Sequence, residues 1–214
     1  MVTLSGSKFI GGPPFSGFLF VPRGLTPKRQ LAAGLGKLFR RAELPSAWQA
    51  ADHLPVGANP GVLLRIEAAL FELERYRSLP IGPRNAVIDP FNKAVRKLSL
   101  RLDSDLVLPA LSGSELHQST LATLDLSRCQ GQPDFMTAQR WCRVLSARGL
   151  RLGQPVKCRK FPNGEWAGTL RISLSMPLIV ELSALPPEQL NQRFDSDMAR
   201  IADVLEAASR PVVA

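Results

Sequence analysis

One lysine near the beginning of the chain lies where a lysine could act as a nucleophile. Lys8 follows the apolar run Met1–Leu4 and precedes a second apolar run, Phe18–Val21, with glycine, proline and serine between them. Short apolar runs bounded by such residues predict two β-strands joined by a loop. Partial desolvation in such a loop can expose the free amine of a lysine, which then attacks carbonyl groups. The alternative is a solvated loop lysine without a chemical role, which is the commoner kind.

A second segment, Gly168–Ser175, combines an arginine with hydroxyl groups at strand spacing. Arg171, Ser173 and Ser175 share one side of an extended strand, and the apolar residues between them share the other. A planar guanidinium group can hold a carboxylate through two parallel, charge-assisted hydrogen bonds. Arg171 is therefore either a carboxylate-binding residue or a solvent-facing arginine on a half-exposed sheet.

Periodic apolar residues predict the helices and strands that would hold these two segments. The expected helices cover Lys28–Arg41, Asn59 to about Pro80, a stretch between Asn85 and Leu102, a stretch from about Asp134, and Pro187 to Ala208. The expected strands cover Thr120–Leu126, Val156–Phe161 and Trp166–Met176, with a hairpin at Asn163-Gly164 between the last two. The residues predicted to face inward on three of the helices are Phe91, Val95, Leu98 and Leu102; Met136, Trp141 and Leu145; and Leu190, Phe194, Met198, Ile201 and Leu205.

Composition and charge limit the class of protein. Of the 214 residues, 45% are hydrophobic, which is enough for a packed core and argues against disorder. The net charge of +9 is spread along the expected helices without interleaved aromatic residues, so we predict no nucleic-acid partner. We recognise no signal peptide and no apolar run of membrane length, and the three cysteines lack CxxC spacing. We therefore predict a reduced, cytoplasmic protein with no membrane partner and no metal site.

The segment Ser5–Lys8, Ser-Gly-Ser-Lys, and the nearby loop Gly-Gly-Pro-Pro-Phe-Ser-Gly resemble the cofactor-lysine segment of fold-type I pyridoxal-phosphate enzymes. The similarity is to the class-V aminotransferase and cysteine desulfurase group, which has Ser-x-His-Lys followed by a Gly-Pro-x-Gly loop. The resemblance implies that Lys8 is the Schiff-base lysine of pyridoxal 5'-phosphate. It also implies that Ser5 and Ser7 contact the cofactor, with Ser7 in the place of the family's histidine. Gly11 and Gly12 would lie in the loop that approaches the cofactor of a partner subunit, so a homodimer is implied.

The same resemblance implies a fold that is α/β to α+β, in three parts. Residues 1–58 would be the last strands of the large cofactor-binding domain, 59–112 linking helices, and 113–214 a small C-terminal α+β domain. Arg171 matches the small-domain arginine that holds the α-carboxylate of the substrate in many such enzymes. The implied substrate is an amino acid or amine.

Fold-type I enzymes carry a large N-terminal portion before the cofactor lysine. The chain is therefore expected to be the C-terminal part of such an enzyme, to pair with the missing N-terminal half, and to be inactive alone. The alternative is a non-catalytic α+β interaction module, a relic fragment that binds another subunit through the apolar surface that the missing half once covered.

Overall fold

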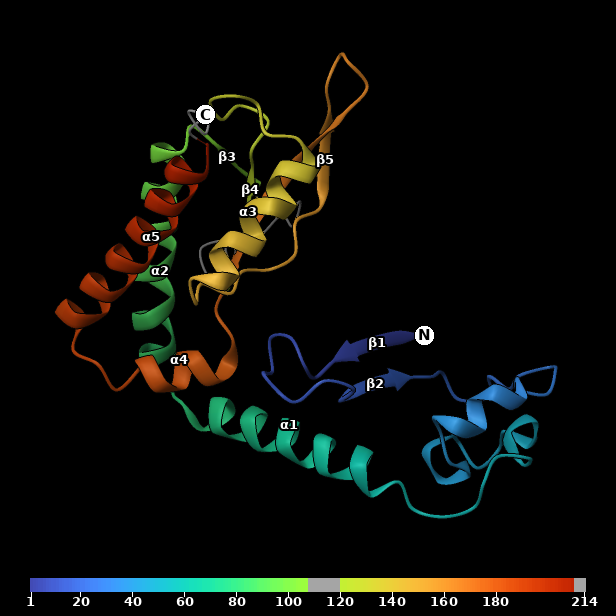
Figure 1. Ribbon diagram of the computed structural model, residues 1–214. Coiled ribbons are helices and arrows are strands. Elements are labelled where there is room, and N and C mark those ends of the chain that lie inside the picture. Colours follow the sequence, from blue (N-terminus) through green and yellow to red (C-terminus); the bar gives the residue numbers. More distant parts are fainter. Residues whose placement is uncertain (108–119, 210–214) are drawn as a thin grey trace. The chain divides into compact units, whose positions relative to one another are not determined.

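The computed structural model describes residues 1–107 and 120–209 and contains two compact units (Figure 1). The first unit is Met1–Arg75 and the second is Tyr76–Ala214. Helices combine with antiparallel sheets, which confirms the expected mixture of α and β structure. The expected three-part division of the chain stays a prediction, because its boundary at residues 112 and 113 lies outside the described residues.

A two-stranded antiparallel sheet begins the first unit. β1 (Val2–Ser5) pairs with β2 (Gly17–Phe20), so that Val2 lies opposite Phe20 and Ser5 lies opposite Gly17. This pairing confirms the prediction of two strands joined by a loop that contains Lys8. Apolar side chains of both strands are exposed, because Val2 is 65% exposed and Phe20 is 57% exposed.

The prediction of a helix over Lys28–Arg41 is wrong. The structure has short 3₁₀-helices in this region and in the loop after it: η1 (Ala33–Lys37), η2 (Arg41–Glu43) and η3 (Gln49–Ala51). Gly34 and Gly36 each weaken an α-helix by about 1 kcal/mol relative to alanine. Leucines of this region pack against Trp48 instead, and the indole N–H of Trp48 donates a hydrogen bond to the carbonyl oxygen of Leu25 at 2.7 Å.

Two consecutive helices, α1 (Pro60–Ser78) and α2 (Ile81–Arg101), confirm the two helices predicted in the middle of the chain. Pro80 separates them at the N-cap of α2. Proline has no backbone N–H to continue the hydrogen bonding of α1, so the chain can start a new helix there. None of the described helices combines the length and apolar character that a membrane crossing needs.

The second unit contains a four-stranded antiparallel sheet and the remaining helices. The strands, in spatial order, are β3 (Asp105–Val107), β4 (Leu121–Asp125), β6 (Trp166–Ser173) and β5 (Lys157–Lys160). The helices after α2 are α3 (Phe135–Ala147), α4 (Met176–Leu182) and α5 (Pro187–Ser209). The predictions of β4, the β5–β6 hairpin, α3 and α5 are confirmed, whereas β3 and α4 were not predicted.

Helices cover one face of this sheet, and α5 lies alongside α2 (Figure 1). The sheet residues that belong to the core beneath these helices include Leu124, Leu170 and Ile172. Gly168 continues this face, and α3 approaches so closely that a Cβ at position 168 would collide with Ala138. The inward-facing residues predicted for α2 and α5 all belong to this core or pack against it.

Two predicted orientations in the second unit are wrong. Met136 is 62% exposed, because it precedes Leu145 by about two and a half helical turns and therefore points to the opposite side of α3. Ser175 does not continue the strand of Arg171, because β6 ends at Ser173 and Ser175 is the N-cap of α4. Pro177 explains the change: proline suits the first turn of a helix and cannot donate to a sheet.

The N-cap of α3 provides a test of how this helix is fixed. Asp134 accepts a hydrogen bond from the backbone N–H of Thr137 at 2.7 Å, and hydrogen bonding to Thr137 lowers the pKa of the carboxyl. A lowered pKa means that the stabilisation is present above the ordinary carboxyl pKa, about 4, and is lost as pH falls through the lower folded-state value. We expect Asp134→Ala to reduce the free energy of unfolding by about 1 kcal/mol at pH 7. Asp134→Asn, which caps without titrating, should lose less stability than wild type on acidification in denaturant titrations; parallel losses would contradict this.

Candidate functional site

Lys8 lies in a loop that backbone hydrogen bonds hold in one shape. The N–H of Gly6 donates to the carbonyl oxygen of Ser16 at 2.9 Å, that of Gly12 to Gly6 at 2.8 Å, and that of Gly11 to Lys8 at 3.0 Å. The side chain of Ser16 is buried, and its hydroxyl donates to the carbonyl oxygen of Pro13 at 2.7 Å. The loop is therefore internally braced on both sides of Lys8.

Helix α1 supports this loop from within the same unit. A Cβ built at Gly12 would lie 2.6 Å from the Cβ of Ala69, so only glycine allows this approach of backbone to helix. Ala69 is 1% exposed. Neither Ser16 nor Ala69 was predicted as a supporting residue; the contact of Ala69 joins the loop to a distant part of the sequence, whereas Ser16 contacts Pro13 and Gly6 within the same hairpin.

The chemical groups of the loop are exposed. Lys8 is exposed, and the hydroxyl oxygens of Ser5 and Ser7 lie 3.3 Å apart, within hydrogen-bond distance. The amine and the two hydroxyls are therefore presented together on one short segment. An amine can bind an aldehyde, and hydroxyls can donate to phosphate oxygens.

The charge of the surrounding sequence favours an anion. Glu43 is the first acidic residue of the chain, whereas the basic residues before it are Lys8, Arg23, Lys28, Arg29, Lys37, Arg40 and Arg41. An excess of one sign of charge raises the local concentration of ligands of the opposite sign. This excess of basic residues can be read from the sequence, and the prediction from the lysine motif did not use it.

Arg171 lies on the sheet face opposite the helices in the second unit. It is half-buried, pairs with Thr123 across β4 and β6, and is followed on the same side by the exposed Ser173. The N–H of Gly153 donates to the backbone carbonyl oxygen of Arg171 at 2.8 Å. The predicted alternation is seen at the end of β6, where Leu170 and Ile172 are buried and Ser173 is exposed, whereas Ala167 and Thr169, on the side of Arg171, are buried as well.

A neighbouring acidic group on this sheet face already has its hydrogen-bond donors. Asp125 accepts the backbone N–H of Ser127 at 2.8 Å and the thiol of Cys158 at 3.2 Å. Burial acts to raise the pKa of Asp125, but these hydrogen bonds outweigh it and lower the pKa. Burial, together with Asp125, raises the pKa of Cys158 to about 11, so this thiol stays protonated at neutral pH. Cys158 is therefore a structural donor and a poor nucleophile.

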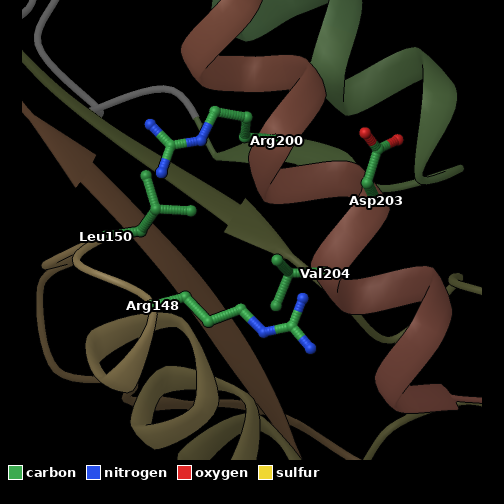
Figure 2. A pocket seen from close by; sticks show the side chains of 5 residues that line it. All are labelled: Arg148, Leu150, Arg200, Asp203 and Val204. Atoms are coloured by element: carbon green, nitrogen blue, oxygen red, sulfur yellow. The ribbon is translucent and has the colours of Figure 1, made fainter.

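A depression elsewhere in the second unit contains none of the predicted site residues. Its lining comes from the turn after α3 and from α5: Arg148, Leu150, Arg200, Asp203 and Val204 (Figure 2). Asp203 is already bound by the guanidinium group of Arg101 at 2.7 Å. The remaining charged groups of the lining are exposed, so this depression offers no desolvated binding group.

The predicted site residues fall into two groups. Ser5, Ser7, Lys8, Gly11 and Gly12 share the loop of the first unit, whereas Arg171 belongs to the second unit. A common site for Lys8 and Arg171 therefore stays a prediction. No protein-family model matches the sequence, and neither a curated protein nor a solved structure matches it significantly. A functional proposal therefore rests on the site residues themselves.

Proposed function

We propose that the chain is the C-terminal part of a pyridoxal-phosphate-dependent enzyme of the class-V aminotransferase type, acting on an amino acid or amine. The observation that carries this proposal is the braced loop between β1 and β2, in which the exposed Lys8 directly follows the segment of Ser5 and Ser7, whose hydroxyls lie within hydrogen-bond distance of each other. The loop residues fit the cofactor, because they offer an amine for its aldehyde and hydroxyl donors for its phosphate.

Each of these residues has a distinct part in the proposal. The amine of Lys8 would hold the cofactor and carry the proton between substrate atoms. The hydroxyls of Ser5 and Ser7 would orient the phosphate, and the backbone at Gly11 and Gly12 would let the loop lie close to a partner subunit. The cofactor supplies electron withdrawal from the substrate, so the type of reaction depends on groups beyond these residues.

The exposed strand pair supports the idea that more protein completes the site. Val2, Leu19 and Phe20 are each more than half exposed, and apolar strands with open faces and edges are usually covered in functional proteins. The covering protein would be the N-terminal half of the enzyme, within a homodimer. The three cysteines are all unpaired, which supports a reducing, cytoplasmic location.

The same exposed apolar strands favour a second candidate function. The chain could be a non-catalytic interaction module that binds another subunit through β1 and β2. In that case an aldehyde would react with Lys8 no more readily than with other exposed lysines of the first unit, such as Lys28. The two candidates therefore differ in the selectivity of one amine.

Reductive trapping tests that selectivity on the full chain. The protein would be equilibrated with limiting pyridoxal phosphate and reduced with borohydride, and the modified lysines would be identified by peptide mass spectrometry. We expect Lys8 to carry severalfold more label than Lys28. Ser5→Ala should lower the label on Lys8, because the phosphate loses a donor. Turnover is not expected from the chain alone.

The matched control is Lys28→Ala, which should leave the label on Lys8 unchanged, whereas Lys8→Ala should remove the preferred product. An even distribution of label over the exposed lysines would contradict the cofactor role and favour the interaction module. Strong cofactor binding that survives Lys8→Ala would assign the site to other residues.

A further inference from the structure

Helix α1 carries apolar residues on two opposite sides. The side that packs within the protein contains Val62, Ile66, Ala69 and Leu73. The other side is solvent-exposed and contains Leu63, Leu64, Leu70 and Phe71, which are 57%, 69%, 41% and 60% exposed. Contiguous exposed apolar side chains on a protein surface often mark a site of interaction with another molecule. The exposed side of α1, which we call the outer face, is therefore a candidate interaction surface.

The four apolar residues of the outer face form one continuous patch. Leu63 and Leu70 lie about two turns apart on the same side of the helix, as do Leu64 and Phe71. Ala69, which contacts the Lys8 loop through Gly12, points the opposite way. The outer face is thus separate from the loop, and a role for it is independent of the proposed function.

The centre of the outer face is acidic. Glu67 lies between the two apolar pairs and is exposed, and no ion pair of Glu67 occurs within the described part of the chain. The end of the patch has its own cation: the guanidinium of Arg75 lies 5.7 Å from the centre of the Phe71 ring and pairs with Glu72 at 2.9 Å. A partner with a cation opposite Glu67 would therefore complement the charge of the patch.

This charge argues against a second copy of the chain as the partner. The apolar positions are symmetric about residue 67, so an antiparallel pair of α1 helices would place Leu63 against Phe71 of the other copy. The same pairing would place Glu67 against Glu67. Two carboxylates facing each other among apolar side chains repel, and an interface that contains them is disfavoured.

We propose that the outer face of α1 docks an amphipathic helix of another polypeptide, with apolar residues on one side and a lysine or arginine at the centre of that side. The apolar pairs supply the contact area, and Glu67 sets the specificity by pairing with the central cation. Two helices pack when the side chains of each fit between those of the other, and residues three and four positions apart provide such contacts.

A charge-swap experiment with defined peptides tests this docking. Two labelled amphipathic peptides of about four turns, alike except for a central lysine or a central glutamate, would be titrated with the full chain by fluorescence anisotropy. The wild-type chain should bind the lysine peptide about tenfold more tightly than the glutamate peptide. Glu67→Lys should reverse the preference, and Phe71→Gln should weaken both complexes.

The matched control is Glu188→Lys at the start of α5, which changes the net charge equally and should leave the preference intact. Failure of the lysine peptide to bind, or the same preference in wild type and Glu67→Lys, would overturn the proposal. Self-association of the wild-type chain that Phe71→Gln abolishes would assign the face to a second copy. A loss of several degrees in Tm with Phe71→Gln would mean that the chain itself covers the face.

Discussion

Replacing Phe91 with alanine should lower the free energy of unfolding of the second unit by about 3–5 kcal/mol. Phe91 is 1% exposed in the middle of α2, and its ring meets that of Phe194 on α5 edge to face, with centroids 5.8 Å apart. Truncation would remove both the buried area and this ring contact and would leave a cavity between the two helices. The neighbouring helix cannot close such a cavity easily, because it is held along its length by further core residues.

Denaturant unfolding, followed by the circular dichroism of the helices, would measure the loss. Leu100→Ala is the matched control, because Leu100 lies on the same helix but is 82% exposed. It should change the free energy of unfolding by no more than about 0.5 kcal/mol. Similar losses for the two variants would mean that α2 does not pack against α5 through the face containing Phe91.

The amphipathic helices of the second unit could be predicted because the sequence repeats their core contacts every turn. In α5, the residues from Leu190 to Leu205 that were predicted to face inward are all buried. The hairpin at Asn163-Gly164 was equally local, since Gly164 adopts a φ of +89° that glycine tolerates. Where a single period and a turn residue determine structure, sequence alone is sufficient.

Prediction failed where local preference and long-range packing disagree. The leucines between Lys28 and Arg41 have helical spacing, but two glycines weaken an α-helix there. Leu31 and Leu35 instead pack against the cluster that contains Trp48. β3 was missed because its three residues form a strand only by pairing with β4. α4 had a local signal, Ser175 followed by Pro177, which the apolar alternation before it obscured.

In the candidate site, too, local features could be predicted from the sequence and long-range contacts could not. The loop around Lys8 follows from its glycines and prolines, and the sidedness of β6 follows from alternation. The contact of Gly12 with Ala69 could not be predicted, because it depends on where α1 packs, well over fifty residues later in the sequence. The hydrogen bond from the Cys158 thiol to Asp125 likewise depends on the register of paired strands, which one sequence does not specify.

In the proposed pyridoxal-phosphate enzyme, the half-buried Arg171 of β6 is expected to hold the carboxylate of the substrate. A guanidinium group binds a carboxylate with two parallel hydrogen bonds, and losing such a contact in a desolvated site costs on the order of 2–5 kcal/mol. Arg171→Ala should therefore weaken amino-acid binding by that amount. Arg171→Lys keeps the charge but lacks the planar fork, so its loss should be smaller but still measurable.

The measurement compares an amino acid with its decarboxylated amine, using the change in cofactor absorbance on ligand binding in a complex with the cofactor-binding half. Both Arg171 variants should impair the amino acid much more than the amine, because only the amino acid carries the carboxylate. Arg151→Lys, at an exposed arginine of the same unit, should affect neither ligand. Equal losses for the two ligands, or no loss for either, would show that Arg171 is a structural or surface residue.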